Sequence, residues 1–259
     1  MGTIGRLYVY IVALVSLLVA AYGAGSLLST IGKVFLQSGM EITPGISFWR
    51  TTISTYTPML LVGGAIWAIH WLGIRGRVAQ SIDEQQAVLS KLFINGILTI
   101  ASIFALLNAV RLIYHVISTV TNASMPPLDI RGRPWDVYNA LVWLVVYAMI
   151  WYYYWQVDEE EGRSTASGVT LRRWYVYITS LVSLGVLGIG LYFSLSLIIS
   201  YLVRGTAVQI VGGGLGSLLR NWSLTLAPIL GGFLWWWLHW LRVARGDIES
   251  VLRQVYLYL

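Results

Sequence analysis

Six stretches of the sequence contain no Asp, Glu, Lys or Arg and are long enough to cross a membrane. They cover Leu7–Gly32, Thr51–Ile74, Leu92–Val110, Val137–Val157, Trp174–Val203 and Asn221–Leu241. A helix that spans the hydrocarbon core needs about 20 predominantly apolar residues. Because that core holds no water, backbone N–H and C=O groups must be satisfied within helices or closed barrels. The sequence therefore predicts an all-α membrane protein with six transmembrane helices.

The composition excludes an ordinary water-soluble domain. Hydrophobic residues make up 57% of the 259 residues and charged residues only 11%, whereas soluble domains carry about 25% charged residues. The formal net charge of +6 fits basic residues that anchor helix ends to lipid headgroups, so we expect no nucleic acid as a partner. The lack of cysteine excludes disulfides, thiolate metal sites and thiol nucleophiles.

The basic residues predict the orientation of the chain. More of them fall on the side of the N-terminus than on the opposite side of the expected helices. Short loops rich in Lys and Arg tend to stay in the cytoplasm. We therefore expect a multi-pass protein of the inner (plasma) membrane with its N-terminus in the cytoplasm.

Two parts of the sequence repeat each other. Arg6–Ile11 reads Arg-Leu-Tyr-Val-Tyr-Ile, and Arg173–Ile178 reads Arg-Trp-Tyr-Val-Tyr-Ile. The Leu-Val-Ser-Leu of Leu14–Leu17 recurs at the same offset in Leu181–Leu184. Agreement of this length predicts an internal repeat. Its units share one orientation, unlike the inverted repeats of many transporters.

A second pattern marks the helix that follows each repeat start. Trp67–Trp71 corresponds to Trp236–Trp240, and Trp151–Trp155 is a variant of both. The sequence thus predicts three tandem two-helix hairpin units, over residues 1–85, 86–165 and 166–250, the second being the most divergent. Residues 251–259 look like the start of a further unit, so we expect the natural chain to extend beyond Leu259.

The repeated Arg-x-Tyr-x-Tyr helix start and the aromatic end of the second helix resemble an uncharacterised family of bacterial membrane proteins. That family is a domain of unknown function with repeated transmembrane hairpins. The resemblance covers most of the chain and implies a helical membrane fold. It implies no assigned chemistry, so no functional residue is carried over from it.

His70 and His239 occupy matching positions of the repeat, each beside tryptophans near the end of an expected helix. One interpretation is axial ligation of a haem or a chlorophyll-type pigment by the two imidazoles. The other is a pair of interfacial histidines within an aromatic belt, which also takes in the aromatic stretch from Trp151 to Trp155 and the tryptophans of 235–240. The sequence leaves both interpretations open and points to no other cofactor.

Asp158–Glu161 is a run of four adjacent carboxylates. A calcium loop alternates its ligands, so we interpret the run as a solvated cytoplasmic connector and expect no metal site. No Asp, Glu, Lys or Arg lies at the middle of an expected helix, which argues against an ion-coupled pump. We find no Ser/His/Asp set, no HExxH motif and no phosphate-binding loop, and therefore expect no catalytic residues and no enzyme.

Three functional hypotheses remain. The first is a scaffold or accessory subunit of a membrane assembly, with the lipid bilayer and other membrane helices or a homo-oligomer as partners. The second is a transporter or channel for an uncharged substrate. The third is a haem- or pigment-binding membrane protein that uses His70 and His239.

Overall fold

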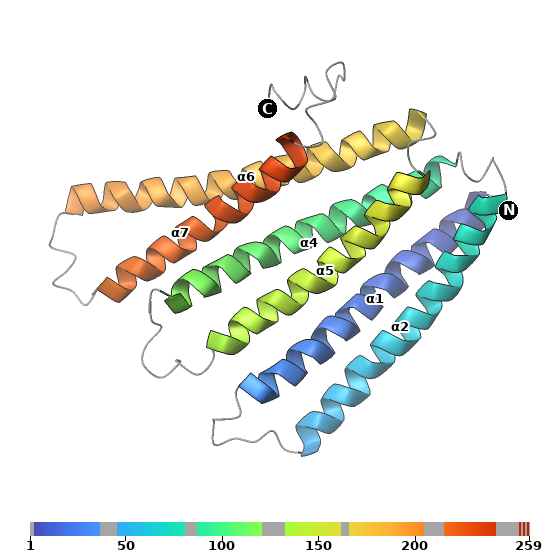
Figure 1. Cartoon of the computed structure of the whole chain (residues 1–259), viewed down its shortest axis with the longest axis horizontal. Helices are drawn as coiled ribbons and strands as arrows, with labels where there is room; N and C mark the ends of the chain where they lie inside the picture. The colour runs from blue at the N-terminus through green and yellow to red at the C-terminus, as the bar shows by residue number, and fades with distance from the viewer. Residues whose placement is uncertain are drawn as a thin grey trace. The chain divides into compact units, whose positions relative to one another are not determined.

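The computed structural model describes residues 3–36, 46–80, 87–120, 133–161, 166–204 and 215–241, together with residues 254, 256 and 258. The long helices, in chain order, are α1 (Thr3–Leu36), α2 (Ile46–Gln80), α4 (Val88–Val120), α5 (Arg133–Glu161), α6 (Ala166–Arg204) and α7 (Leu215–Trp236), shown in Figure 1. A π-helical turn, η4 (Trp237–Leu241), continues α7. No strand occurs among the residues described.

The six helices confirm the predicted fold class. The first five each contain one of the apolar stretches found in the sequence, and α7 together with η4 contains the sixth. All six spans are long and apolar enough to cross a membrane by length and composition. α1 has 34 residues, which at 1.5 Å per residue gives about 50 Å. This exceeds the roughly 30 Å of a hydrocarbon core, so the helix is longer than a span requires.

The chain forms two compact units. Unit 1 comprises Met1–Ser102 and Val145–Tyr175, and unit 2 comprises Ile103–Leu144 and Val176–Leu259. Helices α4, α5 and α6 therefore each contribute one part to each unit. The hairpin boundaries expected from the sequence are a different division of the chain and stay a prediction.

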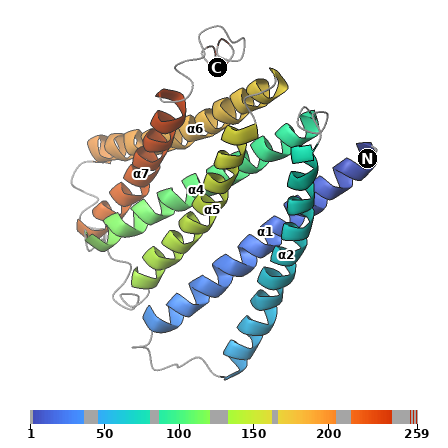
Figure 2. The same ribbon diagram turned by 45° about the vertical axis from the view of Figure 1, so that its right-hand side comes forward.

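In unit 1, α1 and α2 form an antiparallel hairpin with very close backbones (Figure 2). A Cβ on Gly23 would lie 2.6 Å from the backbone N of Leu60. A Cβ on Gly63 would lie 2.9 Å from the backbone N of Ala20. Glycine at both positions lets the two backbones meet, as small residues do where membrane helices associate.

In unit 2, α6 and α7 make the same kind of contact. A Cβ on Gly190 would lie 2.9 Å from the backbone N of Ile229, and one on Gly232 would lie 2.6 Å from the backbone N of Leu187. The hydroxyl of Ser183, beside this contact, donates to the carbonyl of Thr179 at 2.7 Å. Such a bond satisfies a hydroxyl within its own helix.

Each hairpin also ends on a group of aromatic rings. In unit 1 the Phe93 ring lies 4.9 Å from Tyr10 and 5.5 Å from Trp71, measured between centroids. In unit 2 the Tyr256 ring lies 5.7 Å from Tyr177 and 4.3 Å from Trp240, measured between centroids. In both units, a residue of the following segment packs between the first and second helices of a hairpin.

Large apolar side chains point outwards on α1. Exposed residues follow one another at spacings of three and four, and they are Leu7, Ile11, Val15, Leu18 and Tyr22. This spacing places them on a single stripe of the helix. α6 has a similar outward surface, since little of its apolar window is buried. Water would not tolerate so much contiguous apolar surface, whereas lipid would.

Two glycines of α6 provide a direct test of the close packing. Gly190→Ala places a methyl group against the backbone of α7, and overpacking of this kind costs about 1–3 kcal/mol. We expect a melting temperature lower by several degrees, measured on the purified protein in detergent. Gly188→Ala is the matched control, because no atom lies within 4 Å of a Cβ there and alanine favours the helix. Equal melting temperatures of the two variants would contradict the close contact.

Candidate functional site

The most unusual feature of unit 1 is a group of buried polar side chains at the ends of three helices. Asp158, in the last turn of α5, and Lys91, in the first turn of α4, are both 0% exposed. Asn95 lies one turn further along α4 and is also buried. Arg172 approaches them from the early part of α6. Burial of unpaired charge is costly, so the contacts of Asp158 decide whether this arrangement is stable.

Both carboxylate oxygens of Asp158 have partners. Arg172 Nη1 donates to Asp158 Oδ2 at 2.9 Å, and Asn95 Nδ2 donates to Asp158 Oδ1 at 3.2 Å. Charge-assisted bonds of this kind are among the strongest in proteins. The carboxylate of Asp158 thus joins the ends of α4, α5 and α6.

The guanidinium of Arg172 serves three groups at once. Besides Asp158, it donates through Nη2 to Glu159 Oε1 at 2.7 Å. Its Cζ lies 4.4 Å from the centroid of the Trp155 ring, within the range of a cation–π interaction. Arginine suits this position because its planar fork binds two oxygens while its face stacks on an aromatic ring.

A second ion pair lies further out. Arg75 of α2 contacts Glu160 Oε2 at 3.1 Å, and the Glu160 side chain is 63% exposed. Exposed pairs contribute roughly 0–1 kcal/mol. The carboxylates of this run therefore differ in role: Asp158 is a buried structural anion, whereas Glu160 lies at the surface. The prediction that the whole run is a solvated connector is wrong for Asp158.

Hydrogen bonds between tryptophan and tyrosine extend the site away from the charges. Trp71 Nε1 donates to the Tyr153 hydroxyl at 2.7 Å, and Trp151 Nε1 donates to the Tyr175 hydroxyl at 2.7 Å. Tyr154, which accepts a similar bond from Trp67, has no exposed surface. The expectation that residues 151–155 form an interfacial belt is thus wrong for Tyr154, which packs between helices.

The two histidines lie in different compact units. His70 Nδ1 is 2.8 Å from the carbonyl oxygen of Ile66, and His239 Nδ1 is 2.9 Å from that of Trp235. His239 is buried and its ring stacks on Trp235, whereas His70 is half-buried. The structure shows no contact that assigns either ring to a haem or pigment, and their role as ligands stays a prediction. Among the described residues, no three His, Cys, Asp or Glu side chains are grouped to hold a metal ion.

A family model described as a domain of unknown function, DUF5671, matches residues 6–132 and 173–259, well over half of the chain. The chain belongs to the DUF5671 family. No curated protein and no solved structure matches it. The family assignment confirms the resemblance to an uncharacterised family and supplies no residue roles.

The buried cluster of this DUF5671 protein was missed by the sequence interpretation. Residues 151, 154 and 158 follow one another at spacings of three and four, so they share one face of a helix. That spacing places Asp158 on the aromatic, buried side of α5. The signal was present, but four adjacent carboxylates masked it, because the run was interpreted as a whole and not residue by residue.

Arg172→Gln tests the cluster. Removal of one partner from a buried ion pair costs roughly 3–5 kcal/mol, so we expect a large fall in melting temperature. Arg75→Gln is the matched control and should cost less than about 1 kcal/mol, since its pair is exposed. The double variant Asp158→Asn with Arg172→Gln should recover part of the lost stability. If Arg172→Gln were as stable as Arg75→Gln, the burial of Asp158 would not depend on Arg172.

Proposed function

We propose that this protein is a multi-pass membrane scaffold or accessory subunit without catalytic activity. The observation that carries the proposal is that the buried carboxylate of Asp158 has its partners within the protein. Asp158 accepts hydrogen bonds from Arg172 and Asn95 and so joins the ends of α4, α5 and α6. An ion-coupled carrier would need ionisable groups near the middle of its spans, but the charged residues of the described helices lie towards their ends.

The outward surfaces support the same proposal. The exposed stripe on α1 and the largely uncovered α6 are apolar. They suit contact with lipid acyl chains, neighbouring membrane helices or a second copy of the chain. A protein that places its polar groups inside and its apolar groups outside is built to lie within a membrane and to pack there.

We further propose that the hairpins α1–α2 and α6–α7 are two copies of one unit, with α4–α5 as a divergent third. Gly23 and Gly190 match in the sequence repeat, and both make a close backbone contact with the second helix. Tyr10 and Tyr177 also match, and both contact an aromatic residue of the following segment. The two segments matched by the family model begin at Arg6 and Arg173, the first residues of the repeated motif.

Co-purification tests the proposed function. After extraction from the native membrane in a mild detergent, we expect the tagged protein to carry at least one other membrane protein, or a second copy, in constant stoichiometry. A monomer without partners that catalyses uptake of an uncharged solute into vesicles would contradict the scaffold and favour a transporter. A Soret band that is lost in His70→Ala and His239→Ala would favour the haem hypothesis.

The orientation is tested with single cysteines, because these 259 residues contain no cysteine. Gln80→Cys lies at the end of α2 and Val120→Cys at the end of α4, and both residues are exposed. With the N-terminus in the cytoplasm, we expect a membrane-impermeant maleimide to label only Val120→Cys in intact cells. Lysed cells should label both. Labelling of only Gln80→Cys in intact cells would reverse the proposed orientation.

A further inference from the structure

One aromatic position of the proposed repeat packs each time on the hairpin that precedes it. It is the second residue after Arg6, Lys91, Arg173 and Gln254, and it is occupied by Tyr8, Phe93, Tyr175 and Tyr256, respectively. The rings of Phe93, Tyr175 and Tyr256 lie 5.5, 6.3 and 4.3 Å from Trp71, Trp155 and Trp240, measured between centroids. The partner in all three cases is the last tryptophan of the aromatic end of a second helix.

The first tryptophan of the same aromatic end takes part as well. Trp151 Nε1 donates to the Tyr175 hydroxyl at 2.7 Å, and Trp236 Nε1 donates to the Tyr256 hydroxyl at 2.9 Å. The first hairpin lacks this bond because Phe93 has no hydroxyl group. The aromatic end of each second helix therefore receives the start of the unit that follows.

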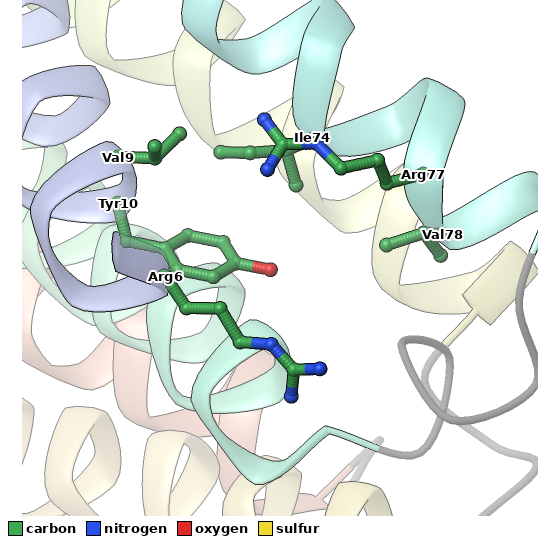
Figure 3. Close-up of a pocket in the computed structure, with 6 residues that line it drawn as sticks. All are labelled: Arg6, Val9, Tyr10, Ile74, Arg77 and Val78. Atoms are coloured by element: carbon green, nitrogen blue, oxygen red, sulfur yellow. The ribbon is translucent and has the colours of Figure 1, made fainter. Parts of the chain in front are cut away.

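The first helix of the preceding hairpin contributes a further ring. The Phe93 ring lies 4.9 Å from Tyr10 of α1, and the Tyr256 ring lies 5.7 Å from Tyr177, the counterpart of Tyr10 on α6. Figure 3 shows the Tyr10 ring pointing from α1 towards the last turns of α2. A following unit thus packs against both helices of the hairpin before it.

At the first repeat, the face that carries this aromatic position is uncovered. Tyr8 is 63% exposed, whereas Tyr175 at the matching position of α6 is 1% exposed. Val15 follows Tyr8 by seven residues, which places it on the same face of α1, and it is exposed as well. We name Tyr8 and Val15 the head face.

On α6, the face that should receive a following unit is uncovered. In α1, Leu17 and Ala21 follow Tyr10 by seven and eleven residues, so the three share a face, and all are buried. Their counterparts on α6 are Leu184, which is 40% exposed, and Gly188, which has no atom within 4 Å of a Cβ. We name Leu184 and Gly188 the tail face.

We infer that a second copy of the chain docks the head face of its α1 on the tail face of α6, in the same orientation in the membrane. The inference rests on the repeat and the membrane location proposed above. The contact continues between copies the one that joins successive units within the chain. Lipid would suit either apolar face, but the matching positions of the other repeats are covered by the chain itself. Because head and tail are different surfaces, the contact is heterologous and adds further copies as a ring or an open row.

Tyr256 occupies the place that Tyr8 of the second copy would take. It lies against Tyr177 and Trp240, as Phe93 lies against Tyr10 and Trp71. Docking therefore displaces the Tyr256 ring, and the two tyrosines compete for one site. Tyr256→Ala should for this reason strengthen the association.

Disulfide cross-linking in the native membrane tests the inference, since the sequence contains no other cysteine. Val15→Cys in one tagged copy is combined with Leu184→Cys in a differently tagged copy. These residues lie about two turns beyond Tyr8 and Tyr177, and both are exposed. We expect a cross-link between the two kinds of copy and none between copies that carry the same cysteine. Both cysteines in one chain should give a ladder of oligomers.

Two variants serve as matched controls. Ile189→Cys places the cysteine on another side of α6, at a residue that is also exposed, and should not cross-link to Val15→Cys. Tyr8→Ala should raise the protein-to-lipid ratio needed for half-maximal cross-linking about tenfold. Tyr152→Ala removes an equally exposed tyrosine from α5 and should leave that ratio unchanged.

Several results would overturn the inference. These are a cross-link between two Val15→Cys copies, equal yields with Leu184→Cys and Ile189→Cys, or weaker association in Tyr256→Ala. The absence of any cross-link would also overturn it and would leave lipid or a further hairpin of the same chain as the occupant of the tail face. Uptake of a solute by the cross-linked copies would contradict the scaffold function and leave the docking intact, so the two failures are distinguishable.

Discussion

The charge of Asp158 has no exposed surface, and the ends of three helices are arranged around it. Its carboxylate accepts from Arg172 of α6 and from Asn95 of α4, so each of its oxygens depends on another helix. A buried ion pair adds little stability compared with an apolar contact of the same size, but an incomplete one is strongly destabilising. The pair therefore makes one arrangement of these helix ends much better than the alternatives.

Close backbone contact fixes the arrangement of the two helices within each hairpin, as the ion pair fixes the arrangement of the helix ends. Gly63 places α2 against Ala20 of α1, and Gly232 places α7 against Leu187 of α6. Between apolar helices in lipid there is little hydrophobic force to bring them together, so dispersion contacts and fit must serve instead. Two glycines per hairpin allow the approach on which those contacts depend.

The Asp158 ion pair and the close glycine contacts both lie inside the protein, and the outer surface of α1 is apolar. The buried carboxylate of Asp158 is satisfied within the chain, and the exposed stripe from Leu7 to Tyr22 is apolar. This apolar outer surface is the basis of the proposed scaffold function.

The sequence by itself determined that the six long helices described by the structure form and where their apolar parts lie. The stretch Leu7–Gly32 is apolar throughout, and an uninterrupted apolar run of that length has few alternatives to a helix, so α1 follows from local information. The family resemblance could also be recognised from the sequence, since it depends on the order of residues along the chain. The aromatic ends of the second helices were seen, but Tyr154 was assigned to the lipid interface because its partner, Trp67, is distant in sequence.

Tertiary structure alone decided which of several similar residues carry the packing. Asp158 and Glu160 belong to the same acidic run, yet only Asp158 is buried, because Arg172 returns to it from the next helix. Gly188 and Gly190 lie two residues apart in α6, yet only Gly190 touches α7. Local sequence is nearly the same in each pair. The difference arises from which face of the helix meets a neighbour, and that is settled only when the helices pack.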